Sequence, residues 1–273
     1  VEIFRNVPVL IWILIIFFVM TAALPAPSAF RGEDPQSSML LDAVAFTNRG
    51  VYVPKPIWGP GSMVVVAVFL ASIAGMIYYR RYATKLLYDT GKLLPMLWPS
   101  LAILILPAIL AYFVMGRPIA LEYPELRGFN FQGGIQIRGS LIALWFALAV
   151  YTGAFIAENV RAGIQAVSHG QTEAAAALGL RPGRIMNLVV LPQALRIIIP
   201  PLISQYLNLT KNSSLAIAVG YMDITGTLGG ITLNQTGRAI ETILLLMLFY
   251  LTISLSISAL MNVYNNAVKL KER

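Results

Sequence analysis

The sequence predicts an all-α integral membrane protein with about six membrane-spanning helices. Of its 273 residues, 58% are hydrophobic and only 12% are charged, about half the charged fraction of an average soluble domain. Several apolar runs approach the roughly 20 residues that a helix needs to cross a bilayer. A soluble fold of this composition would lack the polar surface that keeps it in solution.

Six apolar runs are candidate spans. They cover residues 8–24, 61–79, 94–115, 140–158, 196–222 and 239–262. The fifth run is irregular, because it opens with Pro200-Pro201 and is interrupted by the polar run NLTKNSS. Polar groups at that depth are tolerated only where they are packed in protein or face a wet cavity.

The basic residues predict the orientation. When the chain start is placed inside, twelve of the 20 basic residues fall on the cytoplasmic side, seven fall outside, and Lys211 remains in the membrane. The cytoplasmic set is Arg5, Arg80, Arg81, Lys85, Lys92, Arg161, Arg181, Arg184, Arg196, Lys269, Lys271 and Arg273. This bias predicts a cytoplasmic C-terminus. It also explains the net charge of +8 without a nucleic-acid partner.

Several kinds of chemistry are excluded by the residues that the chain lacks. With no cysteine and a single histidine, His169, it offers no disulfide, no thiolate and no histidine-based metal site or catalytic triad. Its one Gly-Lys pair, Gly91-Lys92, is followed by Leu93 and does not make a phosphate-binding loop. We therefore expect no cofactor in this chain and no ATP hydrolysis by it.

A short helix outside the membrane is predicted in the stretch SHGQTEAAAALGL. Ser168 and Gln171 have the spacing of a capping box, which begins a helix. Four alanines, Ala174–Ala177, are strong helix formers, and Gly179 can adopt the left-handed conformation that ends a helix.

A second short helix is expected to begin at Pro182 and to stop at Leu191-Pro192. The alanine run lacks the large apolar face of an interfacial lipid-binding helix. We therefore favour contact with another protein over contact with lipid headgroups.

The same stretch resembles a known motif. The stretch contains Glu173-Ala174-Ala175, then Gly179 and Val189, and then Leu191-Pro192. This spacing resembles that of the EAA loop of bacterial ABC importer permeases, in which isoleucine stands at the position of Val189. The flanking sequences resemble the polar amino acid branch. The resemblance covers roughly residues 1–24 and 139–265, and NRGVYVPKP is similar to the outer loop of the enlarged permease of general L-amino acid transporters.

The resemblance implies a type I ABC importer transmembrane domain in four parts. These are a first core span at 1–24, an inserted helical hairpin with long periplasmic loops at 25–138, a core permease domain at 139–265 and a cytoplasmic tail at 266–273; coupling helices lie at about 168–192. The family's first helices are absent and the chain begins Val1-Glu2, so we expect a start within a longer protein; a signal peptide is the alternative.

The resemblance also implies partners. Gly170, Glu173, Ala174, Ala175 and Gly179 would contact a dimeric cytoplasmic ATPase, which holds the ATP and Mg²⁺. The protein is expected in the bacterial inner membrane, together with a second, related but non-identical permease subunit. A periplasmic binding protein would deliver L-amino acids to the long outer loops, and ATP-driven motion of the coupling helix would alternate access to the central site.

Polar residues inside the fifth run are candidates for the substrate pathway, because such residues are costly in a membrane. They are Asn208, Thr210, Lys211, Asn212, Ser213 and Ser214. The alternative is that they pack between helices while Lys211 extends to the interface.

Two other functions remain open from the sequence. An ion-coupled secondary transporter would predict buried acids near the membrane centre and an internal repeat. A non-transporting membrane scaffold would not need the polar break in the fifth run.

Overall fold

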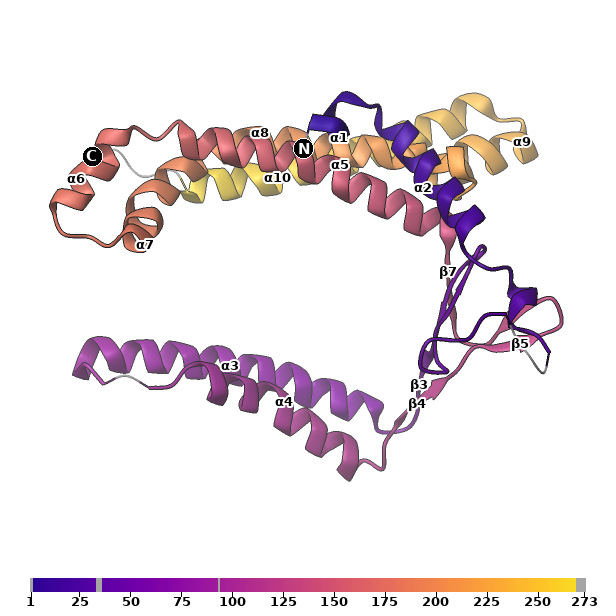
Figure 1. Ribbon diagram of the computed structural model, residues 1–273, viewed down its shortest axis with the longest axis horizontal. Helices are drawn as coiled ribbons and strands as arrows, with labels where there is room; N and C mark the ends of the chain where they lie inside the picture. Colours follow the sequence, from indigo (N-terminus) through magenta and orange to yellow (C-terminus); the bar gives the residue numbers. More distant parts are fainter. Residues whose placement is uncertain (1, 33–35, 93, 269–273) are drawn as a thin grey trace. The chain divides into compact units, whose positions relative to one another are not determined.

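The computed structural model describes residues 2–32, 36–92 and 94–268, and within them six helical segments are long and apolar enough to cross a membrane. The helices of these segments are α2 (Val9–Ala23), α3 (Ser62–Thr90), α4 (Leu97–Val114), α5 (Gly139–Gln165), α8 (Leu191–Asn212) and α10 (Ala239–Val268) (Figure 1). The predicted helical membrane fold with six spans is confirmed.

The chain divides into two compact units. The first unit comprises Val1–Ala26, Thr47–Val51 and Ile137–Arg273, and the second comprises Pro27–Phe46 and Tyr52–Gln136. The division runs through the short strands β1 (Ala45–Thr47), β2 (Gly50–Val53) and β7 (Ile135–Arg138), which pair in the order β1-β2-β7.

In the first unit, α5 packs against α2 and α8, and α10 packs against α8. Buried apolar side chains from α2, α5 and the segment after α8 form one core, which consists of Val9, Ile13, Leu144, Ala147, Leu148, Ala216 and Val219. The short helix α1 (Glu2–Asn6) packs on α5 and places the Arg5 guanidinium 5.6 Å from the ring centre of Phe155. These contacts hold the helices of the first unit together.

Helices α5 and α8 approach closely at Gly163. A Cβ atom added there would lie 2.3 Å from Cγ1 of Ile198, and Ile198 is 3% exposed. Only glycine fits this contact without displacing a neighbour. The contact therefore fixes the separation of α5 and α8 at this point.

The prediction that Leu191-Pro192 stops the second short helix is wrong. Helix α7 (Pro182–Ile185) continues through the π-helix η2 (Met186–Val190) directly into α8. Proline is tolerated in the first turn of a helix, and the Leu191 N–H bonds to the Met186 carbonyl, five residues back. The Gln193 side-chain amide donates to the Val189 carbonyl at 3.0 Å and satisfies an acceptor beside the proline.

The irregular part of the fifth span lies later than predicted. Pro200-Pro201 sit inside α8, which continues to Asn212. The 3-10 helix η3 (Ser213–Val219) follows, ended by Gly220 with φ of 69°. The π-helix η4 (Thr225–Thr232) and α9 (Leu233–Thr236) then lead to α10. Helix α9 lies at one end of this helix group, and α6 (His169–Ala177) with α7 lies at the other (Figure 1).

The second unit contains the hairpin of α3 and α4, which pack along each other. A Cβ atom on Gly75 would lie 3.3 Å from Cγ2 of Ile103, so the two helices are close there. The long loops of the insert contain the 3-10 helix η1 (Pro27–Phe30) and short strands that the sequence analysis did not predict.

These strands form two antiparallel pairs. β3 (Lys55–Trp58) pairs with β4 (Ile119–Glu122), and β5 (Glu125–Arg127) pairs with β6 (Asn130–Gln132). A small core of Ala45, Tyr52 and Phe131 lies among them, and the Tyr52 hydroxyl donates to Oδ1 of Asn130 at 2.8 Å. The long loops are therefore folded rather than merely extended.

Candidate coupling helix and substrate pathway

The predicted extramembrane helix is α6 (His169–Ala177), which follows α5 and precedes α7. Gly179 has φ of 75°. Its N–H bonds to the Ala176 carbonyl at 2.9 Å, and the Leu180 N–H bonds to the Ala175 carbonyl at 3.3 Å. This pair of bonds is a Schellman motif, so the left-handed glycine predicted to end this helix is confirmed.

The start of α6 differs in detail from the prediction. Ser168 is the N-cap residue, but its side chain makes no capping hydrogen bond. The Gln171 N–H instead bonds to the Ser168 backbone carbonyl at 3.1 Å. The capping box is therefore not formed. Within α6, Nδ1 of His169 lies 3.1 Å from Oε1 of Glu173, one turn along the helix, and both side chains are largely exposed.

The five predicted coupling residues divide into two groups. Ala175 is buried and packs with Ile185 and Val190 in a cluster that fastens α6 to the following helices. The exposed group is Gly170, Glu173, Ala174 and Gly179. One face of α6 is thus anchored internally, and the opposite face carries a carboxylate and small side chains to the surface.

Sequence analysis missed Leu178, which is 82% exposed at the end of α6. An exposed aliphatic side chain of this size can fill an apolar pocket on a partner protein. The hydrophobicity of Leu178 suggests a buried residue, and only the turn at Gly179 shows that it faces outward.

The candidate pathway residues lie at the end of α8 and the start of η3. The side chains of Thr210, Ser213 and Ser214 donate to the backbone carbonyls of residues 206, 210 and 211. Ala216 and Val219 belong to the core of the first unit and fix η3 against α2 and α5. The polar break is therefore held at a defined place.

The structure brings together only some of the six pathway candidates. Lys211 and Ser214 line one groove of about 500 Å³ between α8, η3 and α10. Thr210 lines a neighbouring, mostly apolar groove of about 330 Å³. Asn208 is exposed, Asn212 and Ser213 are half-buried, and none of the three lines either groove.

The groove that contains Lys211 also contains residues that the sequence did not single out. Tyr250 and Ser254 of α10 line it opposite Lys211. The Tyr250 hydroxyl lies 2.9 Å from Oγ1 of Thr225 and 3.5 Å from Oδ2 of Asp223. Polar residues alternate in the α10 run LTISLSIS, so the sequence could not show which of them face α8.

Glu158, near the C-terminal end of α5, is held by Arg161. Two hydrogen bonds join the guanidinium to the carboxylate, at 2.5 and 3.1 Å. This pairing occupies both oxygens of the carboxylate.

Comparison with known proteins identifies the family. Residues 67–270 match the model of the "Binding-protein-dependent transport system inner membrane component". The chain belongs to this family. It is therefore a multi-pass inner-membrane permease of an ABC transport system, which decides against a secondary transporter or a scaffold. Such permeases do not hydrolyse ATP and hold no cofactor; binding-protein-dependent systems contain a separate ATPase and a binding protein.

Three curated relatives align with the whole of this permease. It is 52% identical to the "Glutamate/glutamine/aspartate/asparagine transport system permease protein BztB" of Rhodobacter capsulatus, over 69% of that protein. It is 45% identical to the "Putative amino-acid ABC transporter permease protein YhdX" of Escherichia coli K12, over 68% of it. It is 42% identical to the "General L-amino acid transport system permease protein AapQ" of Rhizobium johnstonii, over 66% of it. The chain spans about two-thirds of the length of these relatives.

Proposed function

We propose that this permease imports L-amino acids that a periplasmic binding protein delivers, and that a cytoplasmic ATPase drives it through α6. The names of BztB and AapQ support amino acids as the substrate class. A related but non-identical permease would complete the membrane domain, and the C-terminus would be cytoplasmic, in agreement with the distribution of basic residues.

One observation carries this proposal: α6 is fixed on one face and open on the other. The burial of Ala175 against Ile185 and Val190 joins the helix to η2 and, through it, to α8. The exposed Glu173 and Leu178 are then free to contact the ATPase. A force applied at these side chains would reach the membrane helices through packed side chains rather than through a flexible loop.

The groove between α8 and α10 is our candidate for part of the substrate pathway. Lys211 offers a cation for the substrate carboxylate, and Tyr250 and Ser254 offer hydroxyl groups. The other four candidates lie outside this groove, and they would contact the substrate only on a surface completed by a partner subunit. They are Asn208, Thr210, Asn212 and Ser213.

We assign residues 25–138 to an inserted module whose periplasmic loops would contact the binding protein. The second compact unit, Pro27–Phe46 with Tyr52–Gln136, agrees closely with this range. Its exposed aromatic side chains, including Phe129 at 86% exposure, are suited to a protein contact.

The test uses the reconstituted transporter with its ATPase, second permease and binding protein. Glu173→Lys should abolish binding-protein-stimulated ATP hydrolysis and uptake of labelled amino acids, because it reverses the charge on the contact face. His169→Gln is the matched control: it removes the partner within α6 but leaves the carboxylate, so activity should persist. Full activity of Glu173→Lys would contradict coupling through this face.

A further inference from the structure

Helix α3 is longer than its membrane-spanning part. Residues 62–79 are almost entirely apolar, and at 1.5 Å per residue they extend about 27 Å, close to the hydrocarbon thickness. The remaining residues, 80–90, begin with Arg80 and Arg81 and stay helical to Thr90. We call residues 80–90 the α3 extension.

The start of α4 fixes the depth of this extension. The Tyr79 hydroxyl donates to the Pro95 carbonyl at 2.8 Å, just before α4 begins at Leu97. Figure 1 shows α3 continuing past the first residues of α4. Because α4 has 18 residues and must itself cross the hydrocarbon, the α3 extension lies at and beyond the boundary between hydrocarbon and headgroups.

The α3 extension carries unpaired positive charge. Arg80, Arg81 and Lys85 are exposed, and among the described residues none of them forms an ion pair. Asp89 is the only acid in the stretch. Three cations with one acid attract anions, and the helix geometry holds them within three turns.

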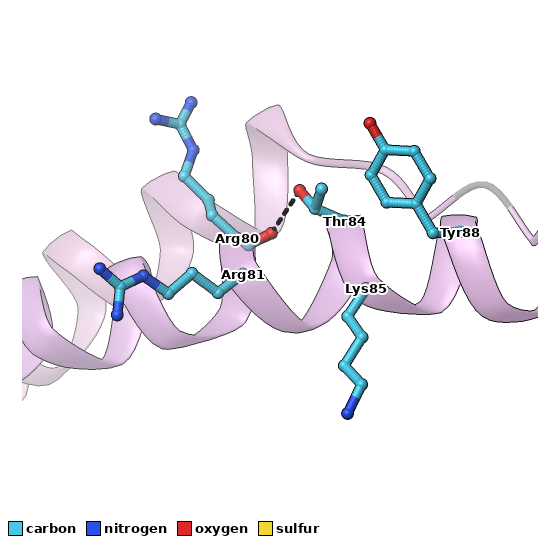
Figure 2. Close-up of a pocket in the computed structure, with 5 residues that line it drawn as sticks. All are labelled: Arg80, Arg81, Thr84, Lys85 and Tyr88. Atoms are coloured by element: carbon cyan, nitrogen blue, oxygen red, sulfur yellow. Dashed lines mark hydrogen bonds between the residues drawn. The ribbon is translucent and has the colours of Figure 1, made fainter. Parts of the chain in front are cut away.

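The cationic side chains border two adjoining grooves. One groove, of about 460 Å³, is lined by Arg80, Arg81, Thr84, Lys85 and Tyr88 (Figure 2). The Thr84 hydroxyl donates to the Arg80 carbonyl at 2.9 Å, so its hydrogen is not available to a ligand in this groove. The other groove, of about 600 Å³, is lined by Tyr78, Arg81, Tyr82, Lys85, Leu86 and Asp89. Arg81 and Lys85, one turn apart, border both grooves.

We infer that the α3 extension binds the phosphate headgroups of anionic phospholipids. Its cations stand beside exposed tyrosine rings, with Tyr78 at 73%, Tyr82 at 50% and Tyr88 at 84% exposure. Tyrosine is enriched at the membrane–water interface, and basic clusters next to a membrane helix attract anionic lipid. An arginine fork can also bind a phosphate through two hydrogen bonds. Depth, charge and aromatic content together favour lipid over a protein partner.

Native mass spectrometry of the assembled transporter, titrated with phosphatidylglycerol against phosphatidylethanolamine, tests this inference. Each cation near a membrane surface contributes about 1 kcal/mol, or roughly fivefold in affinity. Replacing Arg80, Arg81 and Lys85 together by glutamine should therefore weaken phosphatidylglycerol retention roughly a hundredfold. The exchange Arg81→Lys with Lys85→Arg keeps the charge and should retain the lipid.

A second triple variant controls for total charge. Glutamine at Lys55, Arg117 and Arg127 removes the same charge from the opposite end of the insert and should leave lipid retention unchanged. In the unmodified protein, raising the salt concentration should lower retention, which tests the electrostatic origin without any variant.

Three results would overturn the inference. They are equal retention by the glutamine triple variant, displacement of the lipid by millimolar inorganic phosphate, and loss of the ATPase rather than of lipid from that variant. The first denies the site, the second assigns it to free phosphate, and the third assigns it to a protein. The lipid readout does not depend on the transported substrate, so it can fail while the proposed function holds.

Discussion

At the scale of single residues, Gly179 is the position where the backbone conformation sets the turn between α6 and α7. A Cβ atom there would meet nothing within 4 Å, so the constraint is its φ of 75° and not crowding. The left-handed conformation costs a residue with a side chain about 1–2 kcal/mol. The glycine therefore sets the angle at which α6 meets α7 without using any contact.

We predict that Gly179→Val lowers binding-protein-stimulated ATP hydrolysis and uptake. Valine should lower the equilibrium constant for forming the native turn by roughly 5- to 30-fold. Gly179→Asn is the matched control, because asparagine tolerates this conformation and should keep most of the activity. Equal activities of the two variants in the reconstituted transporter would show that the turn is not needed.

Other single residues show what sequence reasoning could and could not assign. The helix that carries Glu173-Ala174-Ala175 was predicted from the sequence, but only the fold shows that Ala175 faces inward, against Ile185 and Val190. Leu178 was missed because an aliphatic residue is read as buried unless the chain direction after it is known. The buried and exposed faces of a helix as short as α6 can be assigned only when the elements that pack against it are known.

At the scale of elements, the sequence predicted the membrane-spanning helices from their apolar length, but it misjudged where one helix ends. All six spans were found because apolar length is a strong signal. Pro192 was predicted to end the helix. A π-helical turn precedes it, in which the Leu191 N–H bonds to the Met186 carbonyl, and the helix continues through the proline. The pairing of Tyr250 with Thr225 also escaped the sequence, because it joins residues 25 apart in different elements.

The contact between α5 and α8 at Gly163 yields a prediction at this scale. Gly163→Ala should destabilise the permease by about 1–3 kcal/mol, because the added methyl group overlaps Ile198. Ile198→Ala alone should also destabilise it, by about 2–5 kcal/mol, through loss of buried side chain. Thermal unfolding of the purified protein in detergent measures both.

The double variant Gly163→Ala with Ile198→Ala decides whether the overlap is the cause. Its loss of stability should be smaller than the sum of the two single losses, because the smaller side chain at 198 leaves room for the new methyl group. Strict additivity would mean that the loss caused by Gly163→Ala does not come from overlap with Ile198.

At the scale of the whole molecule, the long loops show the limit of prediction from sequence. The strands in these loops were not predicted, because the pairing of β3 with β4 joins Lys55 to Glu122, 67 positions further along the chain. Register of this kind depends on tertiary placement rather than on local composition. The division into two compact units follows from the same long-range pairing.

The orientation of the whole chain gives the last prediction, and the absence of cysteine makes it directly testable. Leu41 is 88% exposed between the first two spans, and Leu178 is 82% exposed at the end of α6. In intact spheroplasts, a membrane-impermeant maleimide should label Leu41→Cys and not Leu178→Cys. After permeabilisation, Leu178→Cys should be labelled, and the bound ATPase should protect it. The reverse pattern would place α6 in the periplasm, where no ATP-driven subunit could reach it.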